Sequence, residues 1–250
     1  MIKLIVANWK MAPATLGEAR GILETVNEYL GTLPQGVPAR IVVCPPAIFL
    51  EEVSKLLSLS FLSHNTSLGA QDIFWDEQPA NTGEISGSML QDFGVRYVIV
   101  GHSERRWKLQ ESDETVNKKL KAALEHGLAP IVCLGEQSRD ENFKDFLKQQ
   151  AQATFAGISP EDVSRCLIAY EPVWAISSNP GARPDTPESA MESISVIREA
   201  VGGELHFLYG GSIKSTNIAE FWNQEGLEGV LVGGASVNKE EFIKILSLAK

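Results

Sequence analysis

Residues 166–176 read CLIAYEPVWAI, an apolar run of five residues followed at once by Glu171 and Pro172. Near-continuous apolarity, without alternation, is typical of a strand that is covered on both faces, as the strands of parallel sheets are. The strand should pass into a loop at Glu171, so a single carboxylate stands at its end. The role of this carboxylate depends on which other residues the fold places around it.

Similar apolar runs, rich in β-branched residues, recur along the chain and predict further buried strands. They lie at 2–6, 40–44, 97–100, 129–134, 205–208 and 229–232. Within the less regular stretch LSFLSHNTSL (59–68), residues 60–63 are predicted as one more strand. With 166–170 this makes eight strands.

Helical patterns fill the intervals between these strands. Residues 15–30 and 113–126 carry apolar side chains near a 3.6-residue spacing, and Gly127 is predicted to cap the second helix. STNIAEFW (215–222) and NKEEFIKILSLA (238–249) each begin with a capping residue and have acidic residues in the first turn.

Strand and helix alternating in this way predict a parallel sheet with right-handed crossovers. Eight such units in 250 residues fit a closed (β/α)8 barrel, an α/β fold, with one domain spanning 1–250. The alternative is an open, doubly wound sheet, but no GxGxxG follows the first strand to support a dinucleotide-binding version.

Composition narrows the class of partner. The chain is 44% hydrophobic and 22% charged, which indicates a globular protein, and its net charge of −10 argues against nucleic acid and anionic membranes as partners. No apolar run approaches the ~20 residues that span a bilayer. Three cysteines without close spacing fit neither a disulfide framework nor a zinc site, so we expect no metal and a reducing, cytoplasmic location.

Polar residues follow three of the predicted strands: Asn8 and Lys10 the first, His102 and Glu104 the fourth, and Glu171 the sixth. In a barrel these strand ends share one face, where the βα loops build the active site. Singly, each has a structural alternative: a surface lysine, a capping or core histidine, a carboxylate in an ion pair. Their coincidence on one face favours a catalytic group.

Two glycine-rich turns, YGGSI (209–213) and VGGAS (232–236), follow the last two strands. Singly, each is more often an ordinary tight turn, but two such turns after the last two strands are more specific. Glycines, however, let backbone N–H groups approach an anion closely, and barrels commonly bind phosphate after strands seven and eight. A cradle of amides together with Lys10 can hold a phosphate despite the acidic net charge.

The loop PVWAISSNPGARPDTP (172–187) is long and rich in Pro, Gly, Ser and Asn. It is either an irregular insertion or a lid with a stiff Pro-Val-Trp hinge. A lid is useful when a reaction intermediate has to be protected from water.

Eight motifs, in order and spanning nearly the whole chain, resemble the triosephosphate isomerase family. They are ANWKM (7–11), GAQD (69–72), TGEIS (82–86), VGHSERR (100–106), CLGE (133–136), AYEPVWAI (169–176), YGGSI (209–213) and LVGGAS (231–236). The resemblance implies a TIM barrel, without metal or organic cofactor, that interconverts dihydroxyacetone phosphate and D-glyceraldehyde 3-phosphate through an enediolate. This is a step of glycolysis and gluconeogenesis in the cytoplasm.

The resemblance also implies a role for each candidate residue. Glu171 would be the base, and His102 would polarise the carbonyl and move protons between the oxygens. Lys10 would stabilise the enediolate, Asn8 would hydrogen-bond the substrate, and Glu104 would orient the lysine. The phosphate would bind to amides near Ser177, Gly211, Ser212, Gly233 and Gly234.

The family is usually homodimeric, with a long third loop inserted beside the neighbour's active site. Residues 69–84 match that loop. Thr82 would be its tip contact, and Phe74 and Trp75 would meet the partner. The alternative is that both aromatic rings pack onto their own barrel.

Some positions depart from the family pattern. The lid is about three residues longer than the usual motif, an insertion of the kind that costs little stability. Ser177 stands where glycine is usual, RRWKLQESDE (105–114) lacks a common Phe-Gly, and Ala12-Pro13 follows the ANWKM motif.

Two other functions are compatible with the residues. One is a different phosphate-using barrel enzyme, such as an aldolase or another sugar-phosphate isomerase; Lys10 is the only strand-end lysine for Schiff-base chemistry. The other is a barrel that has lost catalysis and binds partners.

Overall fold

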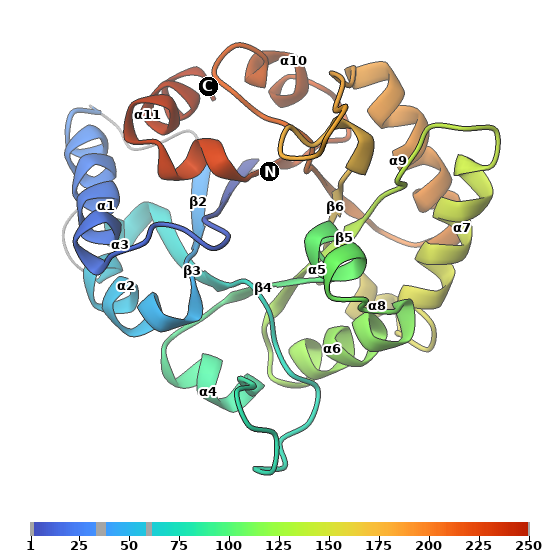
Figure 1. Ribbon diagram of the computed structural model, residues 1–250, viewed down its shortest axis with the longest axis horizontal. Coiled ribbons are helices and arrows are strands. Elements are labelled where there is room, and N and C mark those ends of the chain that lie inside the picture. The colour runs from blue at the N-terminus through green and yellow to red at the C-terminus, as the bar shows by residue number, and fades with distance from the viewer. Residues whose placement is uncertain (1–2, 34–38, 59–61, 250) are drawn as a thin grey trace.

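The computed structural model describes residues 3–33, 39–58 and 62–249, and in these ranges eight parallel strands close into a barrel (Figure 1). β1 pairs with β2 on one side and with β8 on the other, which closes the ring. The predicted α/β fold, a (β/α)8 TIM barrel, is confirmed. The strands are β1 (Lys3–Asn8), β2 (Ala39–Cys44), β3 (Thr66–Ala70), β4 (Tyr97–Val100), β5 (Ala129–Leu134), β6 (Leu167–Tyr170), β7 (His206–Tyr209) and β8 (Gly229–Val232).

Helices form the outer ring (Figure 1). They are α1 (Leu16–Gly31), α2 (Leu50–Leu57), α3 (Leu62–Asn65), α4 (Gly87–Asp92), α5 (Ser103–Lys108), α6 (Asp113–Glu125), α7 (Phe143–Thr154), α8 (Pro160–Val163), α9 (Pro187–Val201), α10 (Ile218–Trp222) and α11 (Lys239–Leu248). Within the described residues, three short 3-10 turns lie in the loops: η1 (Ala47–Phe49), η2 (Val173–Ala175) and η3 (Gly234–Val237).

Most predicted helix ends are confirmed. Gly127 follows α6 with a φ of +66°, a left-handed conformation that glycine adopts without strain. Asn238 caps α11 by accepting a hydrogen bond from the N–H of Glu241. The predicted cap at the start of STNIAEFW is wrong, because α10 begins only at Ile218, after Asn217. Ser215 instead bonds to the carboxylate of Glu241.

The third strand is displaced from its prediction. Residues 60–61, like residue 2 of the first predicted strand, lie outside the described ranges, and Leu62 and Ser63 belong to α3 rather than to a strand. The strand is TSLGA at 66–70, which has few large apolar residues. A Cβ on Gly69 would lie 2.5 Å from the Sγ of Cys44, so the close approach of β2 demands a glycine here. Because of this requirement, the strand lacks the continuous apolar run from which the other strands were predicted.

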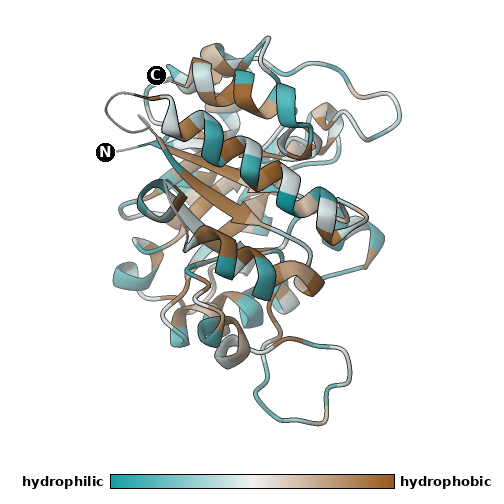
Figure 2. Ribbon diagram, turned by 90° about the vertical axis from the view of Figure 1, so that its left-hand side faces the viewer, coloured by the Kyte–Doolittle hydropathy of each residue, from teal (hydrophilic) through white to brown (hydrophobic). Residues whose placement is uncertain are grey.

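The core has two parts because strand side chains alternate between the two faces of the barrel wall. One cluster fills the inside of the barrel and includes Val6, Ile99, Ile131 and Leu208. The larger cluster packs between barrel and helices. Figure 2 shows apolar strands at the centre, surrounded by helices on which polar and apolar residues alternate.

The loop between β3 and α4 extends away from the body of the barrel in both views (Figures 1 and 2). Its two arms are joined near the base, where the N–H of Phe74 donates to the carbonyl of Ile85 at 2.9 Å. Among the described helices, none combines the length and apolarity needed to cross a membrane.

Candidate active site

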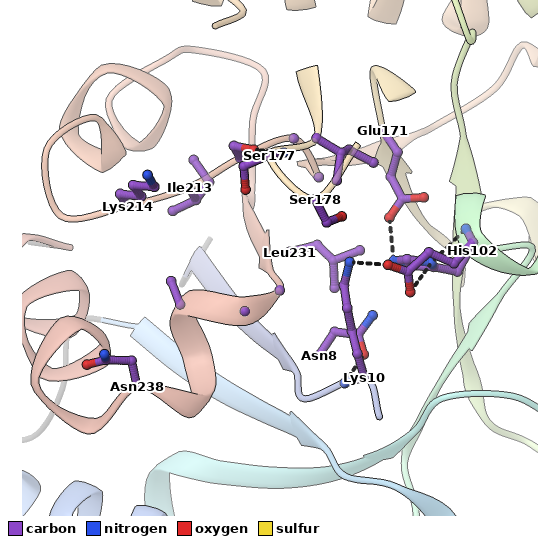
Figure 3. A pocket seen from close by; sticks show the side chains of 18 residues that line it. Asn8, Lys10, His102, Glu171, Ser177, Ser178, Ile213, Lys214, Leu231 and Asn238 are labelled. Carbon is purple, nitrogen blue, oxygen red and sulfur yellow. Dashed lines mark hydrogen bonds and ion pairs between the residues drawn. The ribbon is translucent and has the colours of Figure 1, made fainter. Parts of the chain in front are cut away.

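A cavity of about 450 Å³ opens at the C-terminal ends of the strands and contains all five polar residues predicted from those ends. Asn8 ends β1 and Lys10 follows it, His102 follows β4, and Glu171 follows β6 (Figure 3). Glu104 also follows β4. The predicted phosphate-binding residues line the same cavity: Ser177, Gly211, Ser212, Gly233 and Gly234.

Glu171 is placed by the barrel and held by α5. Its backbone N–H donates to the carbonyl of Leu134 on β5, and its side chain is only 2% exposed. One carboxylate oxygen, Oε2, accepts from the N–H of Ser103 at 2.8 Å, and Oε1 lies 3.1 Å from Nε2 of His102. The carboxylate therefore occupies a position in which two donors stabilise its charge.

His102 precedes α5 and caps it: its Nδ1 accepts from the N–H of Glu104 at 3.2 Å. A nitrogen that accepts carries no proton, so the hydrogen-bond pattern assigns the neutral imidazole with its proton on Nε2. That proton points to Glu171 Oε1. The nearer oxygen of Glu104 to Nδ1 lies 3.8 Å away, too far for a hydrogen bond. A neutral imidazole with an N–H at the cavity can donate to a substrate oxygen.

Lys10 has a left-handed backbone, with φ at +56°, which is uncommon for a residue other than glycine. Side chains hold it on both sides: Asn8 Oδ1 accepts from the Lys10 N–H at 3.0 Å, and Gln71 Nε2 donates to the Lys10 carbonyl at 2.8 Å. Gln71 also donates to the carbonyl of Cys44 at 2.9 Å. The lysine Nζ reaches Glu104 Oε1 at 2.8 Å.

The ion pair with Lys10 controls the protonation of Glu104. Burial raises the pKa of this carboxyl, but the hydrogen bond from Lys10 and the charge of its ammonium outweigh burial, so the pKa lies below the ordinary value. Because the folded pKa is lowered, the pair contributes its full stability above the unfolded pKa. That contribution disappears as the pH falls through the folded pKa.

Lys10→Met is therefore expected to raise the pKa of Glu104 from its wild-type value, because burial raises this pKa and the lysine that mainly lowers it would be absent. A carboxyl carbon NMR titration measures the shift directly. Lys118→Met, which removes an exposed lysine from α6, is the control and should leave Glu104 unchanged. An unaltered Glu104 titration in Lys10→Met would contradict this assignment.

The wall opposite His102 is built from backbone amides. The Ser177 N–H donates to Ser212 Oγ at 2.7 Å, and that hydroxyl donates to the carbonyl of Ala175 at 2.8 Å. Gly233 and Gly234 lie at the start of η3. A Cβ on Gly211 would lie 2.2 Å from the hydroxyl of Tyr209, so glycine is required there by space. These groups supply N–H donors without opposing charge, as an anion cradle needs.

The hinge of the predicted lid is anchored by Glu136, a residue to which the sequence analysis gave no role. Its Oε1 accepts from the Trp174 indole at 2.9 Å and from the Tyr170 hydroxyl at 2.8 Å. Burial raises the pKa of Glu136 above its ordinary value, although these hydrogen bonds act in the opposite direction. Glu136 therefore connects the end of β5 to the first turn of the lid.

Two further residues were missed in the same way. Gln71 fixes the Lys10 backbone, and Cys133 is a buried thiol beside Glu171. Burial, followed by the nearby Glu171 charge, raises the pKa of Cys133 well above its ordinary value. Both lie in motifs quoted from the sequence, GAQD and CLGE, but a motif shows only that residues recur together and not what each one contacts.

The proposed partner-contact residues do not line this cavity. Thr82 is exposed at its loop, Phe74 is half-buried, and Trp75 is 39% exposed. The two aromatic rings contact each other, with centroids 4.1 Å apart. Among the described side chains, no three of His, Cys, Asp and Glu are grouped as a metal site requires.

The model of a known family, described as triosephosphate isomerase, matches residues 3–249. The chain belongs to the triosephosphate isomerase family. It is similar to the triosephosphate isomerase of Caldanaerobacter subterraneus, with 42% identity over 256 aligned positions covering 98% of each chain. The triosephosphate isomerase of Alkaliphilus oremlandii is 40% identical, again over 98% of each chain. That of a Synechococcus strain is 42% identical, over 98% of this chain and 96% of its own.

Family membership confirms the resemblance that the eight motifs predicted. It also shows that the changes in the lid, including Ser177, lie within a chain that matches the triosephosphate isomerase family from β1 to the end of α11.

Proposed function

We propose that this protein is a triosephosphate isomerase, an intramolecular aldose–ketose isomerase that interconverts dihydroxyacetone phosphate and D-glyceraldehyde 3-phosphate. The observation that carries the proposal is the shared cavity of Glu171, His102 and Lys10, with the Glu171 carboxylate 3.1 Å from His102 Nε2. A base, a neutral donor and a cation around one small space match a proton transfer next to a carbonyl.

In this mechanism Glu171 removes a proton from the carbon beside the substrate carbonyl and later returns it to the neighbouring carbon. His102 donates its Nε2 proton to the carbonyl oxygen, and Lys10 stabilises the negative charge of the enediolate. Asn8 donates to a substrate oxygen, and Glu104 keeps the lysine oriented. The backbone amides at Ser177, Ser212, Gly233 and Gly234 hold the phosphate. The reaction needs no metal or organic cofactor.

Glu171 has to leave the Ser103 N–H before it can reach a substrate carbon, because that bond fixes Oε2 at 2.8 Å. We expect the Glu171 carboxylate to make this movement when the lid closes over the substrate. Losing a donor and excluding water both disfavour the charged carboxylate, which favours transfer of the substrate proton to it as the site closes.

The direct test is turnover of D-glyceraldehyde 3-phosphate in a coupled assay, together with binding of 2-phosphoglycolate, which resembles the enediolate. Turnover in folded protein supports the isomerase. Borohydride trapping of a lysine adduct would point instead to an aldolase. Binding without turnover would leave a ligand-binding barrel.

A homodimer is part of the same proposal. Met11 is 99% exposed and Leu109 is 61% exposed, and both line a second cavity of about 470 Å³ that also contains Lys10, His102 and Glu104. Other large apolar side chains exposed on the molecule include Ile48, Trp75 and Met89. Apolar groups beside a catalytic cavity favour a covering partner, and the loop carrying Thr82, Phe74 and Trp75 is the segment proposed to cover it.

Met11→Glu is expected to weaken the dimer and lower activity, because a charge would then be buried against the partner. Sedimentation equilibrium measures the change in mass. Leu248→Glu is the matched control: Leu248 is 46% exposed at the end of α11, far from the cavity. A wild-type chain that sediments as a monomer at micromolar concentration would contradict the dimer.

The proposal also includes a cytoplasmic location and one domain over residues 1–250. All three cysteines are free and buried, which suits a reducing compartment. Fractionation of the native cells tests the location, and limited proteolysis tests the single domain.

A further inference from the structure

The lid contains a closed subloop. Residues 173–175 form η2 and lead through Ile176 to Ser177, whose N–H reaches Ser212. Residues 178–182 then turn back before Arg183 returns the chain toward the hinge. They lie within the lid that is about three residues longer than the family motif. The contacts that close this subloop come from two residues, Asn179 and Arg183.

Asn179 binds the hinge from inside the subloop. Its backbone N–H donates to the carbonyl of Ile176 at 2.8 Å, and its side-chain Nδ2 donates to the carbonyl of Val173 at 2.8 Å. The Ala182 N–H in turn donates to the carbonyl of Asn179 at 3.2 Å. Asn179 thus satisfies carbonyls that a longer loop would otherwise leave to water.

Arg183 joins the far end of the subloop to the hinge. Its N–H donates to the carbonyl of Trp174 at 3.2 Å, and its guanidinium lies over the Trp174 ring, 5.0 Å from the centroid. A cation over an indole face is attracted by the ring quadrupole. Trp174 is itself held by Glu136, so the subloop is connected through the hinge to the end of β5.

We propose that Asn179 and Arg183 are positioning residues that fold residues 178–182 back onto the hinge and hold Ser177 at the cavity wall. There its N–H donates to Ser212 Oγ and would transfer to the phosphate when substrate binds. This inference rests on the proposed function of the cavity. A longer free loop has more conformations to lose when it closes over a ligand. Because the subloop is already closed at both ends, only the hinge has to change conformation when the lid closes. The entropy lost in placing Ser177 is therefore close to that of a shorter lid.

The chemistry at stake is loss of phosphate. In the enediolate, an oxygen lone pair can form a C=O bond while the C=C bond shifts by one carbon and the C–O bond to phosphate breaks, its electron pair leaving with the phosphate. Inorganic phosphate leaves, and the remaining enol aldehyde becomes methylglyoxal. A lid whose amide holds the phosphate in place opposes this elimination, so phosphate release per turnover reports how well the lid is positioned.

The test compares Asn179→Ala, Arg183→Gln and the double variant with wild type. The double variant is expected to bind 2-phosphoglycolate about tenfold more weakly, from the loss of one hydrogen bond and one cation–π contact. KM should rise more than kcat falls, and phosphate release per turnover should increase. Thermal unfolding should stay near the wild-type midpoint, because the lid is outside the core.

Two variants give the controls. Arg40→Gln removes the same charge from an exposed arginine at the start of β2, on the other face of the barrel, and should leave all three readouts unchanged. Arg183→Lys keeps the charge but loses the planar guanidinium, and should recover only part of the affinity.

The inference is overturned if wild type turns over triose phosphates and the double variant matches it in affinity, KM and phosphate release. It is also overturned if Arg40→Gln shows the same changes, since net charge would then be the cause. A wild-type protein without turnover would instead refute the proposed function.

Discussion

Glu171→Gln is expected to lower kcat for D-glyceraldehyde 3-phosphate by about a thousandfold or more, because it removes a positioned base and its charge. The variant should fold. Its side-chain oxygen can still accept from the Ser103 N–H, which holds Glu171 at 2.8 Å, and its volume is almost unchanged. The coupled assay measures turnover, and circular dichroism checks the fold.

The matched control is Glu188→Gln, the same chemical change on an exposed residue in the first turn of α9. It should keep wild-type kcat. Glu171→Gln could instead retain turnover within about tenfold of wild type. That loss in kcat would be far smaller than the rate enhancement that a general base normally contributes. Glu171 would then not be the base, and the assignment of the cavity would fail with it.

Gly135→Ala is expected to disrupt the site through the backbone. A Cβ at this position would lie 1.8 Å from the carbonyl oxygen of Glu171 and 2.5 Å from its carbonyl carbon. Neither atom belongs to a flexible side chain, so β5 and β6 would have to separate. Overpacking of this kind costs about 1–3 kcal/mol, occasionally more. A shift of about 1 Å in the base costs about a hundredfold in rate.

Chemical denaturation and the coupled assay measure the two effects together. Gly17→Ala is the control: Gly17 lies in α1, and a Cβ there meets nothing within 4 Å. Alanine is the better helix former, so this variant should be about 0.5–1 kcal/mol more stable than wild type. A Gly135→Ala protein with wild-type stability and kcat would contradict the close contact between Gly135 and the Glu171 backbone.

Seven of the eight strands were predicted within a residue or two because their apolar runs are continuous. β4 at 97–100, β5 at 129–134 and β8 at 229–232 match the prediction at both ends. β3 was missed because Gly69 and its neighbours are selected by the space beside Cys44 and not by apolarity. A pattern of apolar residues therefore predicts a strand only where burial determines the residue types. It fails where close approach of two backbones requires small residues.

The same distinction holds for the site. Asn8, Lys10, His102 and Glu171 were predicted as site residues because each stands shortly after an apolar run. Gln71 and Glu136 were not assigned a role, because their partners lie far along the chain: Gln71 bonds to Lys10, and Glu136 to Trp174. A residue that acts by orienting another becomes visible only when the two are brought together.

By itself, the sequence determined the alternation of strand and helix, the closed barrel that eight such units form, and the polar groups at the strand ends. These follow from local periodicity and from the common direction of parallel strands, which both act along the chain. The tertiary structure alone decided the neutral tautomer of His102, the left-handed backbone of Lys10 and the closed subloop in the lid. Each of these depends on distances between particular atoms after folding: Glu104 N–H to His102 Nδ1, Gln71 Nε2 to the Lys10 carbonyl, and the Arg183 guanidinium to the Trp174 ring. Hydrogen bonds and close packing are set by such distances and not by the pattern of side-chain character along the chain.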